Sequence, residues 1–368
     1  MKKKNLCKTL LKTICIVLGI LILALLAYIV YLYASYYRIE DNQELVVEAP
    51  VDDTTTGAAA VLATDTEYSA VTYNIGFGAY LPDYSFFMDG GTSSWAESPE
   101  TVQYAINGAG ELVKSLDPDF TLIQEIDLDA TRSYHTDEYE MLRNILPEYT
   151  TVFAQNYDSA FLFYPFTQPH GSSRAGLGLF SKYPVSSALR RSFPISTSFS
   201  KFFDLDRCYS VSRIPVDNGK ELVIFNLHMS AYGNSDEIRK GQIEMLCNDM
   251  AKEYEAGNYV LCGGDFNHDL KASEENAESC ESWAFPFPRT ELPEHFAFCL
   301  DLLSTEEQAA LWNSARNADM EYVPGVTYTV TLDGFIISDN IECLSYENVN
   351  TGYSYSDHDP VKVEFMLK

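Results

Sequence analysis

Short runs rich in β-branched and aromatic residues dominate the chain after residue 67, and this feature constrains its fold most. Two longer stretches between them, 98–116 and 235–256, carry apolar residues at helical spacing. Many strands with few long helices favour two sheets packed face to face over a series of βαβ units. We therefore expect an α/β fold, a four-layer sandwich of two mainly antiparallel β-sheets flanked by helices. The expected strands are YSAVTYNIG, DFTLIQEI, LGLFSKYPV, RCYSVSRIPV, ELVIFNLHMS, NYVLCGGDFN, YTVTLDGFIIS and HDPVKVEFML.

An uncharged run of 22 residues, Thr13 to Ala34, lies near the N-terminus and follows several lysines. At about 1.5 Å per residue it spans roughly 33 Å, enough to cross the hydrocarbon core of a bilayer. The sequence predicts a transmembrane anchor over 13–37, with the basic segment 1–12 in the cytoplasm and the rest of the chain outside. A cleaved signal peptide is the alternative, although the run is long for one and no clear cleavage site follows it.

Residues 38–67 are rich in acids, threonine and alanine and contain no aromatic residue to anchor a core. This composition predicts a flexible acidic tether. The catalytic or binding domain would then occupy residues 68–368.

The net charge is -28, from 53 acidic and 25 basic residues. The first 38 residues contain six basic and no acidic side chains, so the remainder is more acidic than the whole chain. Such a surface repels the phosphates of nucleic acid and disfavours a general DNA or RNA binder, without excluding a nuclease that has a local basic patch. No C-x-x-C spacing indicates a zinc site, and the sequence leaves open whether Cys280 and Cys299 pair.

Polar side chains stand at the ends or starts of several expected strands. One of them alone would indicate a turn, because Gly, Asp and Asn are common turn formers. Repeated on several strands, they predict a single site assembled from the strand edges. Asp and Glu supply hard oxygen ligands for Mg²⁺ or Mn²⁺, and Asp and His can orient or deprotonate a water. These residues are Asn74, Glu125, His228, Asp265, Asn267, Asp333, Asp357 and His358.

The order of these motifs resembles that of the endonuclease/exonuclease/phosphatase superfamily, which shares the deoxyribonuclease-I-like fold. GDFN with a downstream SDH, preceded by QE and NLH at strand ends, carries the resemblance, which extends over about residues 68–367. It implies a phosphoester hydrolase that uses a divalent cation, Mg²⁺ or Mn²⁺.

The resemblance also implies a role for each position. Glu125 would be the principal metal ligand with Asn74 beside it, and Asp357 would complete the metal or water shell. His228 would contact the scissile phosphate.

The remaining positions would act on the attacking water. Asp265 and Asn267 would position it, with His358 as the histidine partner of the reaction. Asp333 would hold His358. We assign the acid/base role to Asp265 and His358 jointly.

The sequence departs from the pattern of the superfamily at two glycines. Gly76 stands where several relatives carry a second acid, which suggests fewer protein ligands for the metal. Gly334 stands where many relatives have a larger residue, which suggests a wider site.

Some further side chains have both a functional and a structural interpretation. Arg174 and Arg316 are candidate phosphate clamps, because guanidinium binds phosphate in a bidentate way, and His170 is a candidate substrate contact. Each could equally be an ordinary structural residue. The aromatic run 283–298 could wall a pocket, touch lipid or pack on the core as a long loop.

The sequence as a whole predicts a membrane-anchored hydrolase of phosphoesters, located outside the cytoplasmic membrane. A small or lipid-borne phosphoester is the expected substrate, because it meets the local field of the site more than the global negative charge. A nuclease and, less favoured, a non-catalytic binding module on the same fold are the alternatives. Oligomeric state is left open.

Overall fold

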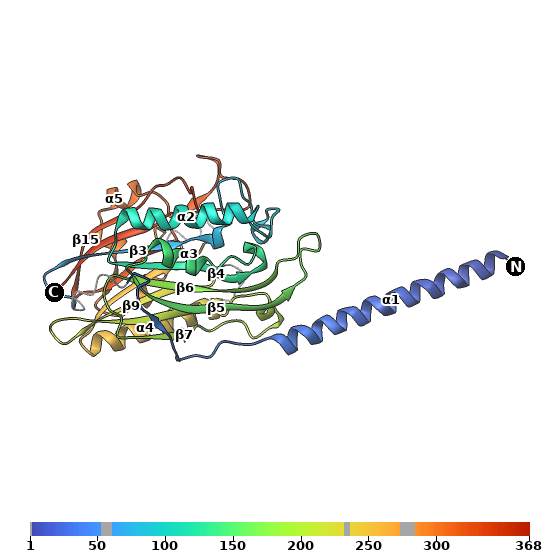
Figure 1. Cartoon of the computed structure of the whole chain (residues 1–368), viewed down its shortest axis with the longest axis horizontal. Coiled ribbons are helices and arrows are strands. Elements are labelled where there is room, and N and C mark those ends of the chain that lie inside the picture. Colours follow the sequence, from blue (N-terminus) through green and yellow to red (C-terminus); the bar gives the residue numbers. More distant parts are fainter. Residues whose placement is uncertain (1, 53–60, 232–235, 273–283) are drawn as a thin grey trace. The chain divides into compact units, whose positions relative to one another are not determined.

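The structure is a computed structural model that describes residues 2–52, 61–231, 236–272 and 284–368. The chain divides into two compact units, Met1–Arg38 and Ile39–Lys368. Figure 1 labels their helices and strands. Cys280, whose pairing with Cys299 the sequence leaves open, lies outside the described residues.

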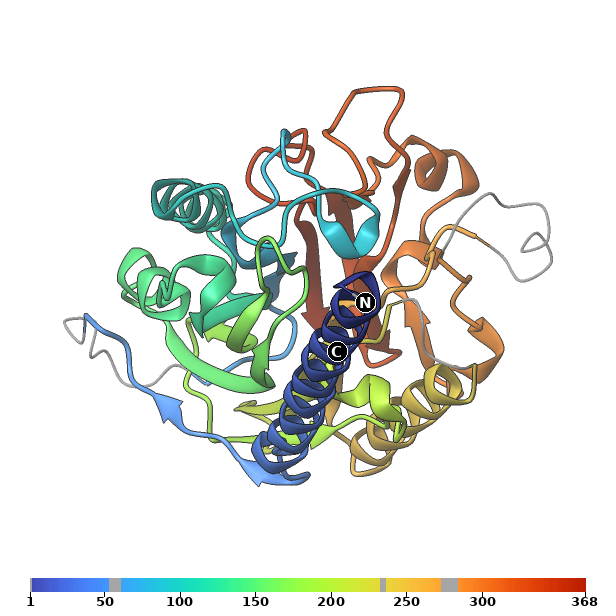
Figure 2. The same ribbon diagram turned by 90° about the vertical axis from the view of Figure 1, so that its right-hand side faces the viewer.

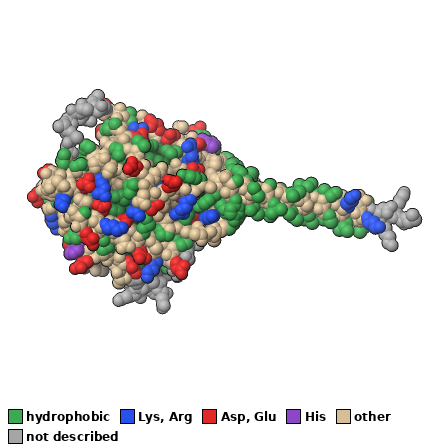
Figure 3. Space-filling view, turned by 90° about the horizontal axis from the view of Figure 1, so that it is seen from below, with side chains coloured by type: hydrophobic (Ala, Val, Ile, Leu, Met, Phe, Trp, Pro, Cys, Tyr) green, Lys and Arg blue, Asp and Glu red, His purple; other side chains and the backbone are tan. Residues whose placement is uncertain are grey.

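The first unit is a single helix, α1 (Lys2–Ser35). Its segment Leu6–Ser35 has a mean hydropathy of 3.0 over its most apolar part, and none of that part is buried. Hydrophobic side chains cover the helix on the face shown in Figure 3. A helix that is apolar all round and unburied in protein suits a bilayer rather than water. The helix is therefore long and apolar enough to cross a membrane, as the sequence predicts.

Two seven-stranded sheets form the second unit, and the predicted sandwich is confirmed. Within each sheet one neighbouring pair of strands is parallel and the other pairs are antiparallel. The strands of the first sheet are, in spatial order, β1 (Gln43–Glu44), β7 (Ser187–Ser192), β8 (Cys208–Pro215), β9 (Glu221–His228), β10 (Tyr259–Asp265), β14 (Asp333–Ser338) and β11 (Phe296–Phe298). Those of the second sheet are, in the same way, β15 (Ile341–Asn348), β16 (Val361–Leu367), β3 (Glu67–Asn74), β4 (Phe120–Ala130), β6 (Gly171–Ser181), β5 (Thr150–Leu162) and β2 (Val47–Glu48).

The sheets pack against each other through a shared apolar core. Leu122 of β4 and Val363 of β16 belong to the same buried cluster as Phe225 of β9 and Leu261 of β10. On the outside, α2 (Pro99–Leu116) and α3 (Glu138–Ile145) cover the second sheet, and α4 (Asp236–Glu255) covers the first. The helices therefore lie on opposite sides of the two sheets (Figures 1 and 2). A short ribbon, β12 (Ala315–Arg316) and β13 (Thr329–Val330), and the helix α5 (Thr305–Ala310) complete the described regular structure.

The described part of residues 38–67 differs from the predicted tether. Strand β1 pairs with β7 and β2 pairs with β5, so these residues extend both sheets at their edges. Leu62 is fully buried and bridges to Val216. Backbone hydrogen bonds and single buried apolar side chains hold this segment on the domain. The segment contains no aromatic residue, so its sequence does not show that it is packed. The second unit accordingly begins at Ile39 rather than at residue 68.

Gly264, the second-to-last residue of β10, allows two strands to approach closely. It has φ +146°, and a Cβ there would lie 2.1 Å from the carbonyl oxygen of Leu227 on β9. We expect Gly264→Ala to lower the free energy of unfolding by about 3 kcal/mol or more, through steric overlap and backbone strain. Gly219 also has positive φ, but its Cβ would meet nothing within 4 Å, so Gly219→Ala should cost only about 1 kcal/mol. Urea unfolding of the full chain would measure both, and equal losses would contradict this explanation.

Candidate active site

The parallel strand pairs bring the predicted polar strand ends together. Strands β3 and β4 run parallel in one sheet, as do β9 and β10 in the other. Asn74, His228 and Asp265 are the last residues of their strands, as predicted, whereas β4 continues to Ala130, so Glu125 lies within its strand and not at its end. His228 is directly opposite Asp265 in the register of β9 and β10. Asn74 of the other sheet donates from Nδ2 to Asp265 Oδ2 (3.0 Å) and Glu125 Oε1 (3.2 Å). A single amide thus connects the two sheets at the site.

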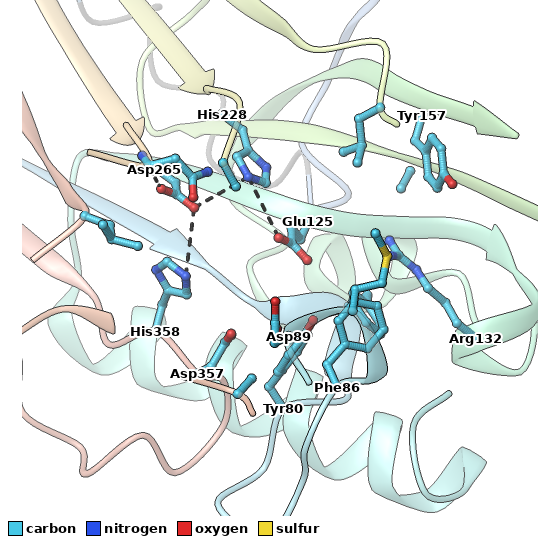
Figure 4. Close-up of a pocket in the computed structure, with 18 of the residues that line it drawn as sticks. Tyr80, Phe86, Asp89, Glu125, Arg132, Tyr157, His228, Asp265, Asp357 and His358 are labelled. Carbon is cyan, nitrogen blue, oxygen red and sulfur yellow. Dashed lines mark hydrogen bonds and ion pairs between the residues drawn. The ribbon is translucent and has the colours of Figure 1, made fainter. Parts of the chain in front are cut away.

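Asp265 lies at the centre of this arrangement (Figure 4). Its Oδ2 is 3.5 Å from His228 Nε2 and 3.9 Å from His358 Nε2, and its Oδ1 accepts a hydrogen bond from the backbone N–H of Asn267. Burial raises the pKa of Asp265 although His358 opposes the shift. A carboxylate with a raised pKa is better able to accept a proton near neutral pH.

His358 is held by a buried carboxylate on its other side. Its Nδ1 is 2.7 Å from Asp333 Oδ2, and the Ser314 hydroxyl donates to the same oxygen at 2.7 Å. Burial alone would lower the pKa of His358, but the charges of Asp333 and Asp265 raise it well above its ordinary value. Asp333 fixes the orientation of the ring and leaves Nε2 directed towards Asp265.

The second imidazole has the opposite character. Burial, with further contributions from Arg207 and from His358, lowers the pKa of His228 well below its usual value. His228 is therefore neutral where His358 is protonated. Because their surroundings separate the pKa values of the two imidazoles, neutral His228 can act as a hydrogen-bonding group and protonated His358 as an acid, both beside Asp265.

Glu125 enters the pocket because β4 is irregular at this point. The register between β4 and β6 shifts between Ile123 and Ile126, and Glu125 has φ +57°. A bulge of this kind redirects a side chain that would otherwise follow the alternation of the strand. The carboxylate lies 3.9 Å from His228 Nε2, and burial raises its pKa, with a further increase from Asp357.

The donor set fits a hard divalent cation. Glu125, Asp265 and Asp357 all line one pocket, and burial raises the pKa of each, so their negative charges lack full compensation. Carboxylate oxygens are the ligands that Mg²⁺ and Mn²⁺ prefer. Ligand atoms of Asp265, Asp333 and His358 also lie within 4.8 Å of one another. Because Asp333 and His358 already bind each other there, the Glu125 side of the pocket is the better cation site.

The pocket has a volume of about 610 Å³ and opens to solvent. Acids line one part of it, and aromatic side chains, among them Tyr80 and Phe86, line another (Figure 4). The structure places six of the eight predicted strand-end residues on its wall, and the other two, Asn74 and Asp333, contact residues of that wall. The six are Glu125, His228, Asp265, Asn267, Asp357 and His358.

The predicted clamps have different positions. Arg316 lines the pocket, but its guanidinium donates to the backbone carbonyls of Tyr80, Leu81 and Asn317 and holds those loops. Arg174 is half-exposed, pairs with Asp129 and is absent from the described pocket wall.

His170, the predicted substrate contact, lines the pocket. Burial, with a smaller contribution from Arg132, lowers its pKa to about 3, so its ring is neutral.

Both atypical glycines are explained by their neighbours. A Cβ on Gly76 would lie 2.7 Å from the ring of Tyr80 and 3.2 Å from Asp357 Oδ1, so Asp357 stands next to the position where a second acid was expected. A Cβ on Gly334 would meet Leu270 and Tyr346 instead of the cavity. Gly334 therefore does not widen the site, contrary to the expectation from the sequence.

The described part of the aromatic run, 284–298, packs on the core. Phe287 and Phe298 are buried and contact the ring of Phe266, and no residue of 284–298 is among those that line the pocket. Phe285 remains exposed. The structure thus supports the interpretation of this run as a packed loop over that of a pocket wall.

Several pocket residues escaped the sequence analysis. Arg132 is buried, pairs with Asp127 through two hydrogen bonds and stacks 3.7 Å above the ring of Phe77. Arg207 and Asn156 are buried in the same wall. None of them belongs to a strand-end motif, so no local signal separates them from structural residues.

A family model described as "Endonuclease/Exonuclease/phosphatase family" matches residues 71–302. No curated protein matches the chain.

Solved structures of related fold include an endonuclease/exonuclease/phosphatase from Bacteroides vulgatus (17% identity, 83% of this chain and 100% of that chain covered, TM-score 0.53). Another is TDP2 from D. rerio, complexed with a single-strand DNA product (14% identity, 82% of this chain and 99% of that chain covered, TM-score 0.54). A third is the human Nocturnin catalytic domain with a bound sulfate anion (14% identity, 82% of this chain and 94% of that chain covered, TM-score 0.52). At these identities the likeness shows the fold alone. Because the family match spans more than half of its length, the chain belongs to the endonuclease/exonuclease/phosphatase family.

Proposed function

We propose that this protein is a membrane-anchored, divalent-metal-dependent phosphoester hydrolase that acts outside the cytoplasmic membrane on a phospholipid headgroup or another small phosphoester. The observation that carries the proposal is the placement of Asp265. One carboxylate lies between a neutral imidazole, His228, and a protonated one, His358, with Glu125 facing the same cavity. Family membership supports the reaction class.

In the proposed mechanism the chain's own residues orient the phosphate and move the proton. Asp265 accepts the proton of the attacking water, while Asn267, whose N–H is bonded to Asp265, helps to fix the carboxylate. His358, fixed by Asp333, supplies positive charge beside the phosphate and can return a proton to the leaving oxygen. His228 Nε2 can donate to a phosphate oxygen. A bound Mg²⁺ or Mn²⁺, held by Glu125 and Asp357, would supply Lewis-acid stabilisation of the phosphate charge.

The proposed location rests on the N-terminal helix and its flanking charge. Five lysines precede the apolar segment, whereas Arg38 is the one basic residue directly after it. Under the positive-inside rule the N-terminus stays in the cytoplasm and the second unit lies outside.

Chain connectivity supports a membrane-borne substrate. Three residues, Tyr36 to Arg38, join α1 to Ile39, and a connection of that length spans about 11 Å at most. The N–H of Ile39 donates to Asp206, which stands between two residues of the pocket wall, Leu205 and Arg207. Through this short connection, a helix embedded in the bilayer would keep the second unit near the membrane.

Exposed aromatic side chains near the pocket mouth support the same substrate class. The loop between β5 and β6 carries Tyr164 and Phe166, whose exposed fractions are 62% and 85%. This loop reaches the pocket, since Tyr164 contacts Phe87, and Phe87 in turn contacts the pocket residue His170. Exposed aromatic rings at a site entrance favour an interface with lipid headgroups.

The test compares two classes of substrate at equal phosphate concentration. We expect the full chain in Mg²⁺ to hydrolyse anionic phospholipid vesicles or a small phosphodiester at least about tenfold faster than plasmid DNA, because the acidic surface repels a polyanion. Asp265→Asn protein serves as the blank for contaminating activity. Efficient cleavage of DNA with no turnover of lipid or small phosphoester would contradict the proposed substrate class and favour a nuclease.

A further inference from the structure

A second polar group of the pocket lies outside the proposed reaction centre. It consists of Arg207, just before β8, and Asn156, on β5. Their exposed fractions are 7% and 1%, so both are almost completely removed from solvent. Arg207 Nε and Nη1 and Asn156 Nδ2 have no hydrogen-bond partner among the described residues. Buried donors without acceptors are costly, and a protein retains them where a ligand supplies the acceptor.

The two side chains are held in one rigid region that joins the two sheets. The buried guanidinium of Arg190 donates to the carbonyls of Gln155 (2.7 Å) and Asp206 (2.9 Å), which are the residues just before Asn156 and Arg207. Cys208 Sγ also lies 3.8 Å from the carbonyl of Gln155. The backbone that carries both donors is therefore fixed before any ligand arrives, which lowers the entropy cost of binding.

The charges around Arg207 leave it available to an anion. Asp204 Oδ1 is 4.0 Å from Nε, beyond hydrogen-bond distance, and the neighbouring cation Arg132 is already bound to Asp127. The acids of the proposed metal side, Glu125, Asp265 and Asp357, line the same cavity, and so do further acids. If acids alone lined this cavity, they would repel any ligand that carries a second anionic group besides its phosphoester. Arg207 supplies a positive charge that can bind such a group.

We propose that Arg207 and Asn156 form an anion subsite that binds a second phosphate or carboxylate group of the substrate, separate from the phosphoester that reacts. The guanidinium supplies charge-assisted hydrogen bonds to the oxygens, and the Asn156 amide supplies a neutral one. That the bound anion is part of the substrate rests on the proposed function, whereas the binding of an anion at Arg207 does not. A doubly anionic molecule would then bind across the cavity, with one group at Glu125 and His228 and the other at Arg207.

The experiment measures binding of inorganic phosphate to the full chain in detergent, with excess chelator, by isothermal titration calorimetry. Chelator removes any contribution from a divalent cation, so the remaining affinity comes from donors of the chain itself, and its loss in the Arg207 and Asn156 variants reports the arginine side of the pocket. We expect Arg207→Gln to weaken phosphate binding at least about tenfold and Asn156→Ala to weaken it a fewfold. Arg207→Lys, which keeps the charge and loses the planar fork, should fall between Arg207→Gln and the unsubstituted chain.

Two control variants separate this proposal from the proposed function. Glu125→Gln should keep phosphate binding in chelator even if hydrolysis is lost, and Arg174→Gln, outside the pocket wall, should change neither. Circular dichroism checks that each variant is folded. The subsite proposal is wrong if the unsubstituted chain binds no phosphate in chelator, or if folded Arg207→Gln and Asn156→Ala proteins bind it as tightly as the unsubstituted chain.

Discussion

Replacing Asp265 by Asn should lower the turnover of a phosphoester by about a hundredfold or more, while the protein stays folded. The amide nearly keeps the shape of the carboxylate but accepts no proton from water and carries no charge opposite His228 and His358. Burial raises the pKa of Asp265, so the ionised group is unfavourable in the folded state without a cation. Asp265→Asn should therefore unfold at the same urea concentration as the unsubstituted chain or a higher one.

His358 provides the matching test of the same centre. His358→Ala should also cost about a hundredfold or more in turnover, and the double variant with Asp265→Asn should lose less than the product of the two single losses, because both residues act on one proton transfer. Steady-state rates corrected for the folded fraction measure all three. Near-normal turnover in a folded single variant would remove that residue from the mechanism, and a fully multiplicative double loss would mean that the two act separately.

Glu125→Gln should raise the Mg²⁺ concentration that gives half-maximal rate by at least about tenfold. The substitution removes one negative charge from the carboxylates that line the pocket and nearly keeps the volume of the side chain. Rates measured across a series of Mg²⁺ and Mn²⁺ concentrations give the shift. Glu111, on the exposed surface of α2, supplies the matched control, and Glu111→Gln should leave the curve unchanged. An unchanged Mg²⁺ curve for Glu125→Gln would exclude Glu125 as a ligand.

The strands and their polar ends could be predicted because both signals are local. A strand such as β10 combines an apolar run with a fixed side-chain alternation, and the polar residue at its end is visible in the sequence itself. The parallel pair β9 and β10 places His228 beside Asp265, and Asn74 joins them to the other sheet by hydrogen bonds. The sandwich and the polar residues at the ends of β3, β9 and β10 therefore follow from local patterns, whereas Glu125 reaches the group through a bulge within β4.

The rest depends on contacts between distant parts of the chain. Strands β1 and β2 contain two residues each, too few for a periodic pattern, so the edges of both sheets looked like a tether. Arg207 and Asn156 meet because Arg190 binds the backbone on both sides, and no spacing in the sequence records that link. Arg316 looked like a phosphate clamp because its charge is visible in the sequence, whereas its binding to carbonyls 235 and 236 residues away is not.

The central claim is that this pocket hydrolyses phosphoesters with the help of a divalent cation. The most direct measurement is the rate at which the full chain hydrolyses phospholipid vesicles and a small phosphodiester, followed by the alcohol and phosphomonoester formed, first in excess EDTA and then after Mg²⁺ or Mn²⁺ is restored. We expect a rate equal to that of the Asp265→Asn blank in EDTA, and recovery on adding the cation, because the buried acids around Glu125 need a countercharge before an anionic substrate can enter. Full activity in EDTA, or an equal metal-dependent rate in the Asp265→Asn protein, would contradict the account.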